Sequence, residues 1–331
     1  MSAMSPWRLS VAPMLDWSDK HGRYLHRLIT KKTRLYTEMV TTGGLLHGGE
    51  RRHLRYDEVE HPLALQLGGS EPADLARCAQ IGARWGYDEI NLNCGCPSER
   101  VQRGAFGACL MAEPQLVADG VKAMVDAVDV PVTVKHRIGI DKEDSYAFVR
   151  DFVGTVADAG CRAFIVHARN AWLKGLSPKE NREIPPLRYE RVYQLKRDFP
   201  HLTIVLNGGV TTDEQIAEHL RHVDGVMLGR EAYHHPWMMS GWDARFLGGA
   251  PNPITPDEVE AAMVAYMQRE LVEDGTPWSA IARHMLGLHH GRRGARLWRQ
   301  VWSDHKLKPL PAVEVAALAR AHLASAAMAV A

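Results

Sequence analysis

The chain has 331 residues, of which 46% are hydrophobic, and a formal net charge of +1. This length allows one large domain and a small one, and the near-zero charge means that any basic surface must be local. The five cysteines are odd in number and contain no C-x-x-C pair, which argues against a disulfide framework, a zinc ribbon or an iron–sulfur cluster. Because no secretory signal and no apolar run of ~20 residues is present, we expect a soluble, cytoplasmic protein in a reducing compartment, with no membrane association and no obligatory protein partner.

Short apolar runs recur along the first two thirds of the chain, and most are separated by stretches with helical spacing. Strands that alternate with helices predict parallel βαβ units, and eight of them predict a (β/α)8 TIM barrel in the α/β class. A doubly wound open sheet is the alternative, but eight regularly recurring strands fit closure better. The expected strands are 9–14, 34–40, 62–67, 89–93, 132–136, 163–167, 203–207 and 225–228.

The composition changes near residues 248–253, where glycines and prolines predict a linker. After it, Thr255 is a plausible N-cap for a helix that begins at Pro256, and further helical runs continue to the alanine-rich end. We therefore expect a barrel over residues 1–248 and a small all-helical domain over residues 249–331.

Residues 91–98, NLNCGCPS, carry the most distinctive pattern of the chain. Ile90 and Leu92 alternate with two asparagines, as in a strand whose faces meet different environments. The glycine and proline that follow predict that Cys96 lies on a loop just past the C-terminal end of this strand. Chemistry takes place at that edge of a parallel α/β protein, although a buried structural cysteine is the commoner use of a lone Cys.

Strand alternation also brings polar residues to the top of the predicted barrel lumen. Apolar neighbours that face the outer helices leave one polar residue per strand facing inward. Each of them has an ordinary structural explanation by itself, but five by the same rule favour a site. The five are Gln66, Asn93, Lys135, His167 and Asn207.

Two glycine-bearing turns follow the last two strands, Asn207-Gly208-Gly209 and Gly229-Arg230. Backbone N–H groups after strands seven and eight of this fold commonly bind phosphate, and Arg230 can add a bidentate contact. With Gln66, Lys135 and His167 nearby, this predicts flavin mononucleotide (FMN) rather than a phosphosugar. Further cofactor contacts are expected at the end of strand one, from Pro13, Met14 and Leu15.

These residues resemble the tRNA-dihydrouridine synthase family. The resemblance lies in residues 91–98 and in APM at 12–14, KHR at 135–137 and HAR at 167–169. GLSPKENREIPPL at 175–187 is similar to the A class, and the likeness extends to RHMLGL at 283–288. It implies reduction of the D-loop uridines at positions 20 and 20a of tRNA.

The resemblance implies roles for individual residues. Flavin N5 delivers a hydride to C6 of uridine, while Cys96 acts as general acid at C5 and Asn93 hydrogen-bonds the flipped-out uracil. NADPH reduces the flavin in a separate half-reaction. No G-x-G-x-x-G follows a strand, which agrees with the absence of a dinucleotide-binding fold, and no metal is expected.

A basic stretch from residue 279 to 309 is the expected tRNA surface. Its cations are Arg283, Arg292, Arg293, Arg296, Arg299, Lys306 and Lys308. Arg296 and Arg299 are expected to reach phosphates, whereas Trp298 and Trp302 are expected in the core. Lys179 and Arg182 form a second patch. Two alternatives stay open: a flavin barrel of the dihydroorotate-dehydrogenase type acting on a free pyrimidine, and a non-catalytic RNA-binding scaffold.

Overall fold

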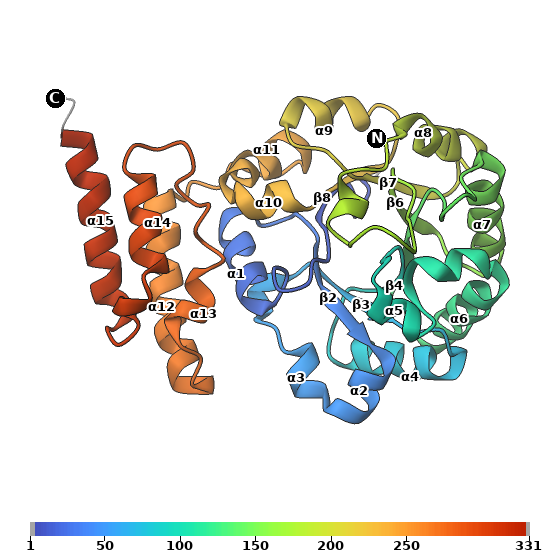
Figure 1. Ribbon diagram of the computed structural model, residues 1–331, viewed down its shortest axis with the longest axis horizontal. Coiled ribbons are helices and arrows are strands. Elements are labelled where there is room, and N and C mark those ends of the chain that lie inside the picture. The colour runs from blue at the N-terminus through green and yellow to red at the C-terminus, as the bar shows by residue number, and fades with distance from the viewer. Residues whose placement is uncertain (1–3, 329–331) are drawn as a thin grey trace. The chain divides into compact units, whose positions relative to one another are not determined.

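The structure is a computed structural model that describes residues 4–328. Its chain groups into two compact units (Figure 1). The first consists of residues up to Ser18 together with Thr33–Gly229, and the second of Asp19–Lys32 together with the residues from Arg230 onward.

The first unit is built on one sheet of eight parallel strands in the order β1-β8-β7-β6-β5-β4-β3-β2. The sheet closes because the residues before β2 pair with β1: Val11 N–H donates to the Arg34 carbonyl at 3.0 Å, and Arg34 N–H donates to the Leu9 carbonyl at 3.1 Å. This confirms the predicted (β/α)8 TIM barrel. The strands are β1 Leu9–Val11, β2 Leu35–Thr41, β3 Leu63–Gly68, β4 Glu89–Cys94, β5 Val132–Arg137, β6 Ala163–His167, β7 Thr203–Asn207 and β8 Gly225–Leu228.

Helices surround the strands of this unit (Figure 1). Helix α6 shows why they pack there: Val117, Val121 and Met124 recur on one helical face and are buried. The α-helices are α2 Thr42–Gly48, α3 Glu50–Leu54, α4 Pro72–Arg84, α5 Glu99–Arg103, α6 Pro114–Ala127, α7 Tyr146–Asp158, α8 Tyr189–Asp198 and α9 Asp213–His219. Short 3-10 helices occupy η1 Glu58–Glu60, η2 Gly107–Ala112 and η3 Glu180–Arg182.

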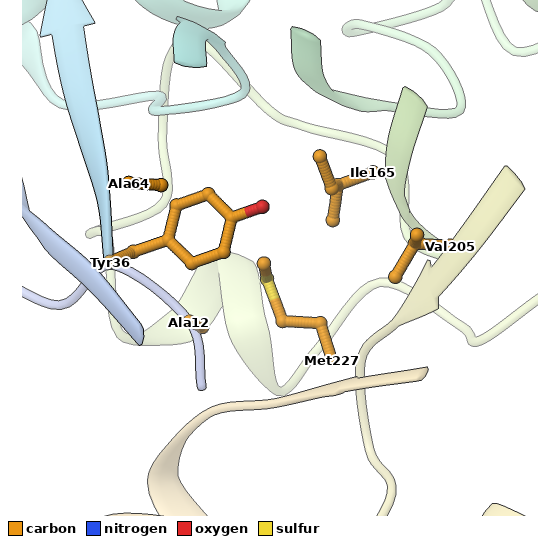
Figure 2. Packing of buried hydrophobic residues seen from close by; sticks show 6 residues of the cluster. All are labelled: Ala12, Tyr36, Ala64, Ile165, Val205 and Met227. Carbon is orange, nitrogen blue, oxygen red and sulfur yellow. The ribbon is translucent and has the colours of Figure 1, made fainter. Parts of the chain in front are cut away.

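The apolar part of the lumen is a small cluster of inward-facing side chains (Figure 2). Ala64 lies two residues before Gln66 on β3, Ile165 two before His167 on β6, and Val205 two before Asn207 on β7. Because alternate residues of a strand share a face, the polar residues continue the lumen face upward, as the alternation predicted. The cluster comprises Ala12, Tyr36, Ala64, Ile165, Val205 and Met227, with Trp7 and Met14 packed against it.

All regular elements among the described residues of the second unit are helices. Helix α12 begins as expected, because Thr255 forms a capping box with Glu258, and it ends at Gly275 with φ 68°. No helix in residues 4–328 is both long and apolar enough to cross a bilayer. The helices are α1 Lys20–Ile29, α10 Arg230–His234, η4 Pro236–Gly241, α11 Trp242–Phe246, α12 Pro256–Asp274, α13 Trp278–Ala282, α14 Ala295–Ser303, η5 His305–Leu307 and α15 Ala312–Met328.

The grouping of the chain differs from the boundary expected at residue 248, since α1 and residues 230–248 join the C-terminal helices. Asp243 explains this: its carboxylate accepts hydrogen bonds from the Thr30 hydroxyl at 2.7 Å and from the Lys31 and Lys32 N–H groups at 2.6 and 3.1 Å. The expected linker at 248–253 lies inside the second unit, where Asn252 donates to the carbonyls of Leu28 and Ile29.

Candidate active site

Cys96 lies on a short loop directly after β4, as predicted, and its side chain is partly exposed. The Asn93 carboxamide oxygen accepts hydrogen bonds from the N–H groups of Gly95 and Cys96, both at 3.0 Å. On the other side, Ala108 N–H donates to the Cys96 carbonyl at 2.9 Å. Gly107 permits this approach, because a Cβ there would lie 2.6 Å from that carbonyl oxygen. The thiol is therefore carried on a backbone fixed from two sides.

Asn93 and Gln66 are joined through their side chains. Asn93 Nδ2 donates to Gln66 Oε1 at 2.9 Å, and Gln66 Nε2 donates to Asn91 Oδ1 at 2.8 Å. Gln66 and Asn91 are buried, whereas Asn93 is partly exposed at the end of β4. The alternation predicted the inward direction of Gln66 and Asn93, but Asn91 was not expected to take part in the site.

Lys135 and Asn207 form a second polar pair in the lumen. Lys135 Nζ donates to Asn207 Oδ1 at 3.1 Å, and Asn207 Nδ2 donates to the Met227 carbonyl at 2.8 Å. Burial lowers the pKa of Lys135 to about 7, with a further lowering from Arg137. An anionic partner placed beside this lysine would stabilise its charged form, which burial disfavours.

His167 stands next to this pair, opposite Asn207 in the register of β6 and β7. Burial, reinforced by the positive charges of Arg137 and Lys135, holds the pKa of His167 well below its usual 6.5. The imidazole is therefore neutral at physiological pH and can offer one N–H donor and one nitrogen acceptor.

The glycine turn after β7 is present. Gly208 and Gly209 have φ values of 114° and 72°, in the region that favours glycine, and a Cβ at Gly208 would lie 2.7 Å from His167 Cδ2. After β8, Gly229 ends the first unit, and a Cβ built on it would lie 3.6 Å from Met14 Sδ. Arg230 follows in the chain as the first residue of α10 and groups with the second unit.

The end of strand one differs from the expectation. β1 stops at Val11 rather than at Met14, since Pro13 has no N–H to donate and Met14 turns toward Ser18. Met14 N–H donates to the Ser18 hydroxyl at 2.8 Å, and that hydroxyl donates back to the Met14 carbonyl at 3.0 Å. The N–H of Met14 is therefore already engaged, and its side chain contacts the lumen cluster. Leu15 is 77% exposed.

Arg137 is a residue of the site that the sequence reasoning missed. Its Nε donates to the Gly95 carbonyl at 3.1 Å, and one terminal nitrogen donates to the Asn181 carbonyl at 3.0 Å. Burial lowers its pKa to about 10. Arg137 thus ties the Cys96 loop to the loop after β6. The signal was available, because Arg137 has the same strand parity as Lys135.

The loop after β6 folds around the buried Asn181 side chain, which accepts from Trp172 N–H at 2.7 Å and donates to the Trp172 and Leu176 carbonyls. Lys179 and Arg182 flank it with exposed side chains. The charge of Arg182 acts on the lumen, since it lowers the pKa of both Lys135 and His167.

Helix α14 carries the expected basic face of the second unit. Arg296 and Arg299 are exposed. The Trp298 and Trp302 indoles are buried, as expected, and donate to one oxygen of Glu260 at 3.0 and 3.1 Å. Of the other five cations in the basic stretch 279–309, two form ion pairs and three have no acidic partner among residues 4–328. The pairs are Arg283–Asp19 and Arg292–Asp257, and the unpaired cations are Arg293, Lys306 and Lys308.

Known proteins are similar in sequence to this chain over nearly its whole length. Residues 10–322 match the family model for dihydrouridine synthase. The tRNA-dihydrouridine(20/20a) synthase of Salmonella typhimurium strain LT2 is 59% identical over 308 residues, which cover 93% of this chain and 92% of that protein. The protein of the same name from Vibrio parahaemolyticus is 59% identical over 309 residues, 93% of this chain and 94% of that protein. The one from Escherichia coli strain K12 is 59% identical over 302 residues, which cover 91% of this chain and 87% of that protein. A match of this length places the chain in the dihydrouridine synthase family.

Proposed function

We propose that the protein reduces uridine to 5,6-dihydrouridine at positions 20 and 20a in the D-loop of tRNA, in the cytoplasm. The names of relatives that share 59% of their aligned residues with this chain support the substrate. The single observation that carries the proposal is a partly exposed thiol, Cys96, on a fixed loop beside the polar end of a barrel lumen. A free thiol at this edge is suited to proton transfer.

The lumen groups fit FMN. Lys135 is an enclosed cation that lacks an anionic partner among the described residues, so a flavin N1–C2=O edge complements it. Gln66, Asn207 and His167 add amide and imidazole groups along the same rim. Gly208 and Gly209 form a turn with positive φ after β7, and Gly229 follows β8 with Arg230 next in the chain. Backbone N–H groups of such turns are the proposed phosphate contacts. Pro13, Met14 and Leu15 are the proposed contacts to the ring from the end of β1.

FMN, once reduced by NADPH, supplies the hydride that uridine C6 accepts. The chain supplies the proton: Cys96 transfers its thiol proton to C5, and the resulting thiolate regains a proton from solvent. The Cys96 side chain lies within electrostatic range of the cations Lys135 and Arg137. Asn93 hydrogen-bonds the uracil and holds it against the thiol.

Exposed cations form the proposed tRNA surface. Arg296 and Arg299 on α14 are exposed and have no acidic partner among the described residues, so they can contact phosphates. Lys179 and Arg182 on the loop after β6 contribute from the barrel. A uridine in folded tRNA has to be extruded to reach the lumen, which requires contacts that hold the tRNA backbone.

A spectroscopic titration tests the proposal. We expect the purified protein to retain FMN, its visible absorbance to be bleached by NADPH under anaerobic conditions, and the colour to return when unmodified tRNA is added. A free pyrimidine added in place of tRNA should leave the flavin reduced. A colourless protein that does not take up FMN, or reoxidation by the free pyrimidine alone, would contradict it.

A further inference from the structure

A single line of hydrogen bonds runs through the lumen from the base of the barrel to the Cys96 loop. It starts at Glu89, whose side chain is buried at the beginning of β4. Thr133 donates its hydroxyl proton to Glu89 Oε1, and Asn91 Nδ2 donates to the Thr133 oxygen at 2.7 Å. Asn91 then accepts from Gln66, Gln66 from Asn93, and Asn93 from the Cys96 N–H, at 2.8, 2.9 and 3.0 Å.

The two ends of this line have fixed polarity. At the base, Glu89 also accepts from the Trp7 indole at 2.8 Å, from Arg34 at 3.1 Å and from the Tyr36 hydroxyl at 2.8 Å. Indole and guanidinium groups only donate, so the Glu89 carboxylate acts as an acceptor. At the other end, the backbone N–H groups of Gly95 and Cys96 can only donate.

Between these ends, each side chain can form both of its hydrogen bonds along the line in one orientation only. A carboxamide turned by 180° would place its nitrogen against another donor and its oxygen against another acceptor. Reversal of Asn91, for example, would direct its oxygen to the Thr133 oxygen, whose only proton is already donated to Glu89. Because every side chain of the line from Glu89 to Gln66 is buried, an unmade hydrogen bond there is costly, and the orientation is transmitted along the line to Asn93.

We propose that Glu89, Thr133 and Asn91 are positioning residues for the proposed reaction: they fix the carboxamide of Gln66 and Asn93, and through Asn93 the backbone of Cys96. Their role in the reaction rests on the proposed function. Their effect on the backbone of the Cys96 loop does not depend on it. The side chains of the three residues are fully buried, and the line reaches Cys96 only through Gln66 and Asn93.

The line also determines what Asn93 can offer to a ligand. Its carboxamide oxygen already accepts two backbone N–H groups, and its nitrogen donates once to Gln66. One N–H is left, so Asn93 can serve only as a donor. The atom of a bound base that faces it is therefore an acceptor and not an amino group or a ring N–H, and in uracil the acceptors are the two carbonyl oxygens.

Hydrogen exchange tests the mechanical claim without substrate or cofactor chemistry. Thr133→Val keeps the side-chain volume and removes the hydroxyl, whereas Thr133→Ser keeps the hydroxyl. We expect Thr133→Val to raise the exchange rate of the Gly95 and Cys96 amides by about fivefold to tenfold, the worth of one net hydrogen bond, and Thr133→Ser to leave it unchanged. Thr203→Val is the matched control, because the Thr203 hydroxyl has no hydrogen-bond partner among residues 4–328.

Peptides from helix α7 report any loss of global stability in the same experiment. If Thr133→Val does not fold, Thr133→Ala and Thr133→Ser provide a second pair that differs only in the hydroxyl. Unchanged exchange at Gly95 and Cys96 in the variant without the hydroxyl would overturn the proposal. So would an increase of the same size in Thr203→Val.

Activity then separates this inference from the proposed function. If the wild-type protein makes dihydrouridine, Thr133→Val should slow this reaction about tenfold in single turnovers. The tRNA Kd and the rate of flavin reduction by NADPH should stay unchanged. Equal loss in all three quantities would indicate a general structural defect and contradict a positioning role. A wild-type protein that makes no dihydrouridine would contradict the proposed function, and the exchange result would still decide whether the line holds the loop.

Discussion

Lys135 donates a hydrogen bond of 3.1 Å to Asn207 across the barrel lumen, where only part of the lysine side chain reaches solvent. No carboxylate of the described residues pairs with it, and burial lowers its pKa from 10.5 to about 7. The ammonium therefore destabilises the protein as long as no anion is bound. The proposed flavin, with its anionic N1–C2=O edge, would offset this cost.

The stability of flavin-free protein should depend on Lys135 and on pH. A cation whose pKa is lowered by folding destabilises the folded state fully below the folded pKa, near 7, and this effect vanishes as the pH rises toward 10.5. We expect Lys135→Met to raise the free energy of unfolding more at pH 6 than at pH 9.5, with a difference of up to about 3 kcal/mol. Urea unfolding at the two pH values measures the difference. An equal effect at both would show that Lys135 is not perturbed.

Replacing the proposed acid should separate binding from chemistry. Cys96→Ala should retain FMN and tRNA binding but slow dihydrouridine formation in single turnovers by ~10²–10⁴-fold, the usual worth of a general acid. Cys109→Ala is the matched control, since Cys109 is the other partly exposed cysteine and its thiol donates to the Phe106 carbonyl. Full activity of Cys96→Ala would refute the acid assignment.

Arg137 should contribute to stability through its three backbone acceptors. Arg137→Lys cannot reach the carbonyls of Gly95, Asn170 and Asn181 together. We expect a loss of about 1–3 kcal/mol in the free energy of unfolding, with faster proteolysis of residues 172–184. Arg103→Lys is the control, because the one partner of the Arg103 side chain among the described residues is Glu99, in an exposed ion pair. Unaltered cleavage of that loop in Arg137→Lys would show that the arginine does not hold it.

The basic face of α14 should determine affinity for tRNA without affecting the flavin. Replacing Arg296 and Arg299 together by Ala should weaken binding and reduce the slope of log K against log salt by about two, if each contacts one phosphate. NADPH should still reduce the flavin at the wild-type rate. Arg150→Ala with Arg221→Ala, two exposed barrel arginines, is the control pair. A lost flavin half-reaction would mean that α14 serves the redox site.

Local pattern was sufficient to predict much of this structure. The strands expected at 163–167, 203–207 and 225–228 have those bounds, because turn residues end each apolar run. Alternation also predicted the lumen face of Gln66, Asn93 and Lys135, since a strand leaves only two directions for a side chain. Thr255 was recognisable as an N-cap from its neighbours alone.

Contacts between distant segments were not predictable in the same way. Asp243 binds the N–H groups after α1 across more than 200 residues of sequence, and no local pattern reports such a bond. Arg137 and Thr133 had the right parity, but parity gives a direction and not a partner. Hydrogen-bond partners depend on strand register and loop path, which the sequence pattern alone does not fix.

The most direct test of the proposed function is to map dihydrouridine in tRNA. An unmodified tRNA transcript is incubated with the purified protein, FMN and NADPH, digested, and analysed by mass spectrometry for the mass increase of two hydrogens at each uridine. The account predicts dihydrouridine at positions 20 and 20a in the wild-type reaction and none with Cys96→Ala in the same time. Absence of dihydrouridine with wild-type protein, or its appearance only at other positions, would contradict it.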